Sequence, residues 1–317
     1  MSSENSEKTD QLSESHKSVG RFAAYLREAG RQPSTVDSYG RDARFFVSYL
    51  NSQGLAISQV EPATLVAFEE YLRTEKMERE NSVRRSVIGV RLFYRYLVES
   101  AVIRSTPFDE VPIPQRTEDL PAALSTLDFP TLLEAAMSEP SPLRKNRNRV
   151  ISCLLALEGL KASELIELKW KDVLDFSSGM TLQVHGLRKR VIVVCEESRD
   201  AICEYRPVLA LALGLENEAA LATSDSRVMV AFQGRDGGTI HPHMTRHGIK
   251  FVIYELGEKL GLPHLNSEVL RHYAVTNLLS LGKSVEDIKI HLGLRRAGNI
   301  TKHVAGNHPQ QLVSGLI

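Results

Sequence analysis

Apolar side chains recur every three or four residues along most of the chain, which is the spacing of amphipathic helices. The clearest case is residues 34–50, where Ser34 stands at the position of an N-cap. The apolar stripe of this segment comprises Val36, Tyr39, Ala43, Phe46, Val47 and Leu50, and its polar face comprises Asp37, Arg41, Arg44 and Ser48. The segment therefore predicts a helix that buries one face and exposes two arginines.

Two more helices are predicted before residue 100. One begins at Pro62, and the other covers residues 81–98, in which Arg84, Arg91 and Arg95 lie at offsets 0, 7 and 11. At about 100° per residue, these arginines fall within about 20° of one line. A solvated helix face is one interpretation of this row. The other is that three cations, spread over about 16 Å, follow a phosphate backbone.

A proline-rich stretch, VPIPQRTEDLP, indicates a linker between two domains. The Ser- and charge-rich start of the chain lacks the apolar core of a signal peptide and is typical of a disordered tail. We therefore expect a tail (1–18), a first helical domain (19–112), a linker (113–122), a second domain (123–305) and a C-terminal tail (306–317).

The second domain combines helices with a hairpin. Residues 147–173 predict a buried helix, a Gly-Leu-Lys turn and a further helix for which Ser163 is the expected cap. Residues 180–194 alternate as strands do on either side of a basic turn. The turn presents Arg188, Lys189 and Arg190, either to solvent alone or against phosphates and into a minor groove.

Two short helices are predicted near the end of this domain. The first carries Leu270, Tyr273, Ala274, Leu278 and Leu281 at helical spacing, and Gly282 offers a left-handed stop. The second has Ser284 as its cap, Asp287 as a capping-box acid, Ile288 and Leu292 on its buried face, and Gly293 at its end.

Composition narrows the classes of function. Lys+Arg and Asp+Glu both number 39, so any DNA-binding surface must be a local patch. The three cysteines form no CxxC pair, which fits a reducing cytoplasm, and no run of eighteen apolar residues predicts a membrane span. His241, His243 and His247 lack metal-ligand spacing, so neither zinc nor any other cofactor is expected, and a helix N-terminus or a DNA-facing surface is the better interpretation.

Several of these segments, in this order, resemble the tyrosine recombinase (phage integrase, Xer-like) family. GLKASEL is similar to the family's Gly-Leu-Arg-x-Ser-Glu-Leu, and EVLRHYAVTNLLSLGKSVEDIKIHLGLRRAGNITKH is similar to its C-terminal signature of His-x-x-Arg-His, Leu-Gly-His and a later Tyr. The resemblance covers about residues 18–305. It implies a mainly α (α+β) fold, in which an N-terminal SAM-like helical core-binding bundle precedes a catalytic-type helical domain with a small antiparallel sheet.

The resemblance also identifies the positions of the family's active site. In that family a Tyr attacks a DNA phosphate without a metal, two arginines grip the non-bridging oxygens, and Lys and His handle protons. This chain keeps Arg271, and Lys189 or Arg188 are displaced candidates for the hairpin lysine. The other positions hold Lys161 (first Arg), Glu268 (first His), Leu294 (last His) and His303 (Tyr).

We therefore expect a DNA-binding member of this family that does not cleave DNA and serves as an accessory or regulatory subunit in site-specific recombination or integration. The expected phosphate contacts are Arg41, Arg44, Arg84, Arg91, Arg95, Arg188, Lys189, Arg190 and Arg271. The expected partners are double-stranded DNA and, through the C-terminal tail, a second copy or an intact recombinase. Two alternatives stay open: an active recombinase with His303 as nucleophile, and an interaction subunit without DNA binding.

Overall fold

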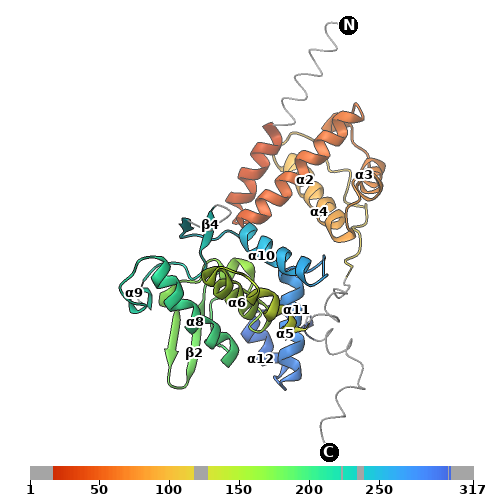
Figure 1. Cartoon of the computed structure of the whole chain (residues 1–317). Helices are drawn as coiled ribbons and strands as arrows, with labels where there is room; N and C mark the ends of the chain where they lie inside the picture. Colours follow the sequence, from red (N-terminus) through yellow and green to blue (C-terminus); the bar gives the residue numbers. More distant parts are fainter. Residues whose placement is uncertain (1–16, 118–127, 223, 234–238, 299, 301–317) are drawn as a thin grey trace, which may run out of the picture. The chain divides into compact units, whose positions relative to one another are not determined.

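The computed structural model describes residues 17–117, 128–222, 224–233, 239–298 and 300. The chain divides into two compact units between Asp119 and Leu120. None of the helices in the described ranges combines the length and the apolar character that a membrane span requires. The predicted fold class, a helical bundle followed by a mainly helical domain with small antiparallel sheets, is confirmed (Figure 1).

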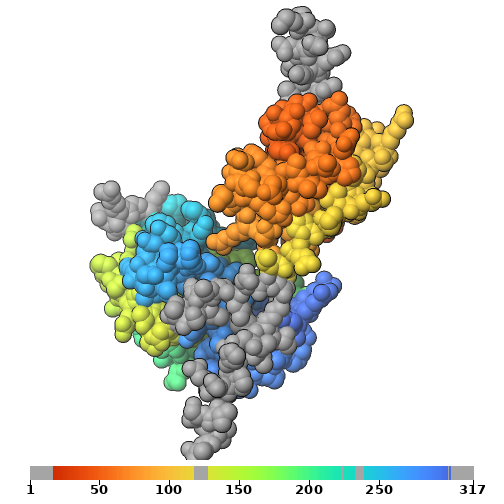
Figure 2. Space-filling model, turned by 90° about the vertical axis from the view of Figure 1, so that its right-hand side faces the viewer, coloured from red at the N-terminus to blue at the C-terminus, as the bar shows by residue number. Residues whose placement is uncertain are grey.

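The first unit is a bundle of helices. It comprises a helix over residues 17–28, α2 (Pro33–Ser52), a 3₁₀ turn (Ile57–Gln59), α3 (Pro62–Thr74) and α4 (Glu80–Glu99). Its core is rich in fully buried aromatic residues, namely Phe22, Phe46, Phe68, Phe93, Tyr94 and Phe108. The chain after α4 leads into the yellow surface seen on the flank of the orange helices (Figure 2).

Helix α2 confirms the predicted stripe and corrects its predicted cap. Val36, Phe46 and Leu50 are buried, whereas Arg41 and Arg44 are exposed. The N-cap is Gln32 and not Ser34, because Pro33 occupies the first turn with its fixed φ and the helix therefore begins before Ser34.

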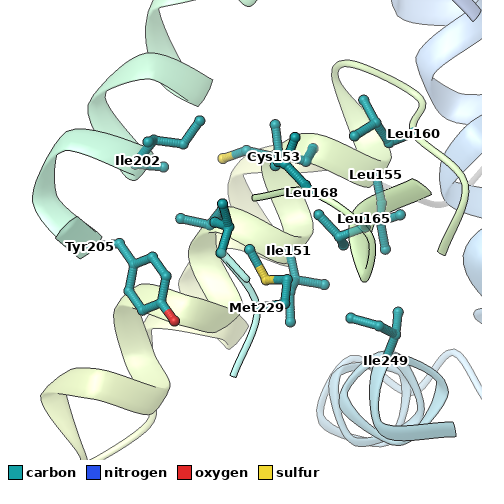
Figure 3. Close-up of a cluster of buried hydrophobic side chains, with 14 of the residues drawn as sticks. Ile151, Cys153, Leu155, Leu160, Leu165, Leu168, Ile202, Tyr205, Met229 and Ile249 are labelled. Atoms are coloured by element: carbon teal, nitrogen blue, oxygen red, sulfur yellow. The ribbon is translucent and has the colours of Figure 1, made fainter. Parts of the chain in front are cut away.

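The second unit is built around α6. Its helices are α5 (Phe129–Met137), α6 (Pro142–Ala156), α7 (Ala162–Leu165), α8 (Glu196–Ala212), α9 (Ala219–Ala222), α10 (Arg246–Lys259), α11 (Ser267–Ser280) and α12 (Val285–Leu292). Helix α6 packs against α5, α8 and α11, so it is apolar on nearly every side from Val150 to Ala156. Figure 3 shows Ile151, Cys153 and Leu155 among side chains that other segments contribute.

Two small antiparallel sheets complete this unit. A 3₁₀ turn (Trp170–Asp172) leads into β1 (Val173–Phe176), which pairs with β2 (Gly179–Val184), which in turn pairs with β3 (Arg190–Val193). Strands β4 (Ala231–Gln233) and β5 (Thr239–His241) form the second sheet. The hairpin predicted over residues 180–194 is therefore confirmed, with the basic turn between β2 and β3.

The helix ends that shape the site follow local signals. Gly282 and Gly293 have φ of 75° and 61°, and the Ser284 hydroxyl accepts the Asp287 N–H at 3.1 Å, as predicted. Ser163 does not cap α7. The N-cap is Lys161, whose backbone N–H donates to the Glu164 carboxylate at 2.9 Å, so the carboxylate binds the helix start in place of a hydroxyl.

Candidate nucleic-acid site

A shallow cavity of about 220 Å³ brings three of the predicted positions together. Lys161 enters from the start of α7, and Glu268 and Arg271 enter from the first turns of α11. Arg246, the first residue of α10, completes the lining together with Ala162, Ser163 and Ser267. Three cations and two hydroxyls suit an oxyanion, but the exposed Glu268 carboxylate sets an anion among them.

Arg271 is the residue that matches the family pattern, and its guanidinium is bound to the protein itself. One terminal nitrogen donates to the Gly159 carbonyl and the other donates to the Leu292 carbonyl at 2.6 Å. The residue is 7% exposed, and burial lowers the pKa of its guanidinium. Arg271 therefore ties the turn before α7 to the C-terminal end of α12.

Gly159 allows this close packing. Its φ is +62°, and a Cβ there would lie 2.4 Å from Leu292 Cδ2 and 3.0 Å from Ala274 Cβ. A side chain at this position would strain the backbone and force the Leu292 side chain out of its place. The turn thus requires glycine for its conformation and for the space that α12 occupies.

A buried ion pair lies beside Arg271. The Arg190 guanidinium donates to both oxygens of Glu164, at 2.9 and 3.1 Å, and its Nε donates to the His291 carbonyl at 2.6 Å. The Arg190 and Glu164 side chains are 6% and 8% exposed. Arg190, which was expected to face phosphates, is instead held in the interior, because a carboxylate and a helix-end carbonyl both lie within its reach.

The other two cations of the hairpin turn are exposed. Arg188 and Lys189 lie at the surface, and a Cβ on Gly293 would lie 3.4 Å from Arg188 Cβ, so the turn sits beside the end of α12. At the base of the turn, the His185 ring lies 2.8 Å from the buried Asp172 carboxylate. This contact fixes the strand that leads into the turn.

Of the remaining positions expected from the resemblance, Leu294 lies within the described residues and His303 does not. Leu294 packs against a small apolar cluster that includes Val275, Ile288 and Leu292. His303 lies outside the described residues, and so does the C-terminal tail. Tyr273, after which the sequence contains no tyrosine, stacks on Phe129 with ring centroids 6.4 Å apart, and burial raises the pKa of its hydroxyl.

Helix α10 adds a surface that the sequence interpretation described only in part. Thr245 caps this helix by accepting the Gly248 N–H at 3.1 Å. The residues that follow expose Arg246, His247, Lys250, Phe251 and Tyr254, the two aromatic rings to 56% and 52%. His247, Lys250, Phe251 and Tyr254 follow i, i+3, i+4, i+7 spacing, so cations and aromatic rings share one face. In the sequence, the signal that could have indicated this surface is a threonine at a helix start, Thr245, followed directly by Arg246 and His247.

In the first unit, the arginine row on α4 is not a uniform exposed surface. Arg84 and Arg91 are half-buried and donate to backbone carbonyls of residues 109–114, whereas Arg95 is 57% exposed. On α2, Arg41 and Arg44 are both exposed. Of the five arginines expected to contact phosphates in this unit, three are therefore exposed, namely Arg41 and Arg44 on α2 and Arg95 on α4.

The described residues contain no group of three side chains able to hold a metal ion. His241, His243 and His247 are exposed along the approach to α10 and its first turn. His247 thus lies at a helix N-terminus, as one of the two interpretations predicted, and contact of these side chains with DNA stays a prediction.

Family models match both units. Residues 19–100 match the N-terminal SAM-like domain of phage integrase, and residues 124–303 match the phage integrase family. Tyrosine recombinase XerC of Roseiflexus castenholzii is 28% identical over 276 residues, which cover 85% of this chain and 83% of that protein. XerC of Oceanobacillus iheyensis is 26% identical over 296 residues, covering 92% of each.

Solved structures share the fold. XerH site-specific recombinase bound to its difH substrate aligns with a TM-score of 0.63 at 15% identity, over 94% of this chain and 83% of that chain. A lambda integrase dimer bound to a core site aligns with a TM-score of 0.61 at 13% identity, over 91% and 94%. At these identities the likeness concerns the fold.

Proposed function

Because the chain belongs to the phage integrase family of tyrosine recombinases, we propose that it binds duplex DNA at a recombination site without cutting the strands. Its role is that of an accessory or regulatory subunit. It occupies a site or assembles with an active recombinase, and the C-terminal tail makes the protein contact.

The distribution of exposed cations supports the DNA-binding part of this proposal. With a formal net charge of zero, the chain has no general attraction for polyanions, so binding depends on local groups. The candidates are Arg41, Arg44, Arg95, Lys161, Arg188, Lys189, Arg246 and Lys250. Several relatives in solved structures hold DNA, XerH and lambda integrase among them.

The proposal that the chain does not cleave DNA rests mainly on one observation, which is that the sequence contains no tyrosine after Tyr273. Tyr273 itself is packed on Phe129 and burial raises the pKa of its hydroxyl, which disfavours the phenolate. Removal of a nucleophile alone can cost about 10⁶ in rate. Glu268 repels a phosphate, Leu294 offers no proton, and Lys161 has no planar two-pronged grip.

A covalent-trapping experiment tests the proposal. Nicked suicide duplexes from the DNA flanking the gene are incubated with the full chain, and a covalent band is sought after denaturation. We expect no such band, together with retarded duplex in native gels at 50 mM salt. A denaturant-resistant band that disappears in His303→Ala would establish the alternative nucleophile.

Binding has its own signature in the same experiment. With five or more phosphate contacts, affinity should fall by roughly 10² to 10³ between 50 and 200 mM salt. If no duplex is retained at 50 mM salt, DNA binding is absent and the chain is an interaction subunit.

A further inference from the structure

The segment that leaves the first unit lies antiparallel along one face of α4. Arg91 donates to the Asp109 carbonyl at 3.1 Å and to the Val111 carbonyl at 2.6 Å. Arg84 donates to the Pro114 carbonyl at 2.5 Å, and the Asn81 amide donates to the Thr117 carbonyl at 2.9 Å. Four donations from one helix thus hold residues 109–117, which we call the strap.

The strap sequence suits this role. Pro112 and Pro114 keep the residues before them extended, and extended backbone of this kind makes no internal hydrogen bonds. Its carbonyls are therefore available to an outside donor. Two apolar side chains anchor its beginning, because Phe108 is fully buried and Val111 is 6% exposed in the core of the bundle.

The dimensions agree. The stretch of α4 from Asn81 to Arg95 takes 14 steps, or about 21 Å at 1.5 Å per step. In the strap, Asp109 and Glu110 belong to a turn, and the stretch from Val111 to Thr117 takes 6 steps, or about 19 Å at 3.1 Å per step. Because the two lengths match, donors spaced along one helix face meet successive carbonyls of the strap. At the far end, Arg95 lies 3.7 Å from the Asp109 carboxylate.

We infer that Arg84 and Arg91 act as a clasp for the strap and not as phosphate contacts. The clasp makes Thr117 the point at which the connection to the second unit, the tether, begins. It thereby sets the length of the tether and, through that length, the affinity with which the two units together bind DNA. The first statement rests on the contacts within the first unit, and the second rests also on the DNA binding proposed above.

The consequence for binding can be estimated. With the strap held, residues 118–127 connect the units, and release of the strap adds nine residues to these ten. The effective concentration of one unit near DNA held by the other falls roughly as the −3/2 power of tether length, which is about 2.5-fold here. Loss of two phosphate contacts would behave differently, because it would lower the slope of log K against log salt by about 1.8.

Limited trypsinolysis of the full chain tests the clasp without DNA. Arg116 is exposed within the strap, so the rate of cleavage after it, followed by mass spectrometry, reports strap release. We expect several-fold faster cleavage in the double variant Arg84→Gln, Arg91→Gln. We expect no change in Arg44→Gln, which removes an exposed arginine from α2.

A second variant acts from the other side of the contact. Pro112→Gly with Pro114→Gly loosens the strap and leaves α4 untouched, so it should also accelerate cleavage after Arg116, even if the arginine variant fails to fold. Equal cleavage rates in the wild type and in every folded strap or clasp variant would overturn the clasp.

DNA titrations across salt concentrations complete the test. We expect the double arginine variant and the double proline variant each to weaken binding about 2.5-fold at every salt concentration, with an unchanged slope of log K against log salt. Arg44→Gln should instead reduce that slope by about 0.9. A slope lowered by about 1.8 in the arginine variant alone would show that Arg84 and Arg91 contact phosphates. A wild type that binds no duplex refutes the proposed function, and the proteolysis still decides the clasp.

Discussion

Arg188 and Arg190 lie two positions apart in the same hairpin and have opposite environments. Arg188 is exposed, whereas the Arg190 side chain is 6% exposed and bound to Glu164 and the His291 carbonyl. Its partners lie 26 and 101 residues away in the sequence, so local pattern could not reveal them. By contrast, the assignment of Lys161, Glu268 and Leu294 to family positions rests on local sequence motifs and stays a prediction.

The first prediction concerns this buried pair. Arg190→Ala should lower the free energy of unfolding by about 3 kcal/mol, because it leaves the Glu164 carboxylate buried without its cation. Arg188→Ala, the matched control, should change it by less than about 0.5 kcal/mol. Chemical denaturation of the full chain measures both, and equal effects of the two substitutions would contradict the burial of Arg190.

The second prediction is the pH dependence of the same pair. Burial alone would raise the pKa of Glu164, but the hydrogen bonds from Arg190 and from the Lys161 backbone bring it below its ordinary value. A carboxyl group with a lower pKa in the folded state stabilises the fold above its unfolded pKa, about 4.3, and this contribution is lost as pH falls through the folded pKa.

Wild-type stability should therefore decline as the pH is lowered below about 4.3. Glu164→Gln should reduce that decline without abolishing it, since the His291 ring 3.3 Å away and the hydrogen bond from the Cys195 backbone likewise lower the pKa of Glu158 against the effect of burial. Denaturation midpoints between pH 3 and 6 measure the effect. Glu216→Gln, at an exposed position, serves as the control, and a decline of equal steepness in Glu164→Gln would refute the assignment.

Among the secondary-structure elements, periodicity predicted the existence of helices and strands well and their first residues less well. Helices α2, α3 and α4 and the β2–β3 hairpin occur where apolar spacing placed them. The caps at Ser34 and Ser163 were wrong, because a neighbouring Pro33 and the Glu164 carboxylate determine those starts. A hydroxyl near a helix start is only one of several groups that can begin it.

The third prediction concerns the exposed face of α10. Lys250→Ala should weaken DNA binding and reduce the slope of log K against log salt by about 0.9, the contribution of one phosphate contact. Lys259→Ala, on the last turn of the same helix, should leave the slope unchanged because Lys259 is paired with Glu139 at 2.9 Å. Fluorescence anisotropy over a salt series gives both slopes, and identical slopes for Lys250→Ala and the wild type would remove α10 from the DNA surface.

At the scale of the whole molecule, the fold class followed from motif order and was confirmed, whereas the state of the cations did not follow from the sequence. In both groups of predicted cations, the arginines of α4 and the basic turn between β2 and β3, some side chains bind acceptors of the protein itself. A guanidinium group can donate to backbone carbonyls as well as to phosphates, and only the folded chain shows which carbonyls lie within its reach. The sequence therefore overstated the number of available phosphate contacts.

The fourth prediction concerns assembly. The sequence ends with Leu312, Val313, Leu316 and Ile317, an apolar group that favours a protein partner. Deletion of residues 306–317 should weaken self-association or association with an intact recombinase and leave the far-ultraviolet circular dichroism unchanged. Sedimentation velocity and pull-down measure this, and unchanged results in both would argue against a role for the tail in assembly.

The two backbone hydrogen bonds of Arg271 affect how chains of this family are sorted into active and inactive groups. Loss of the arginine would leave two buried carbonyls without donors, so selection for a folded protein is enough to keep it. Its presence is then explained by folding alone and does not by itself establish cleavage. A classification that takes this arginine alone as a sign of enzymatic activity would count family members without cleavage activity as active recombinases. The identities at positions 268, 294 and 303 are the better diagnostic.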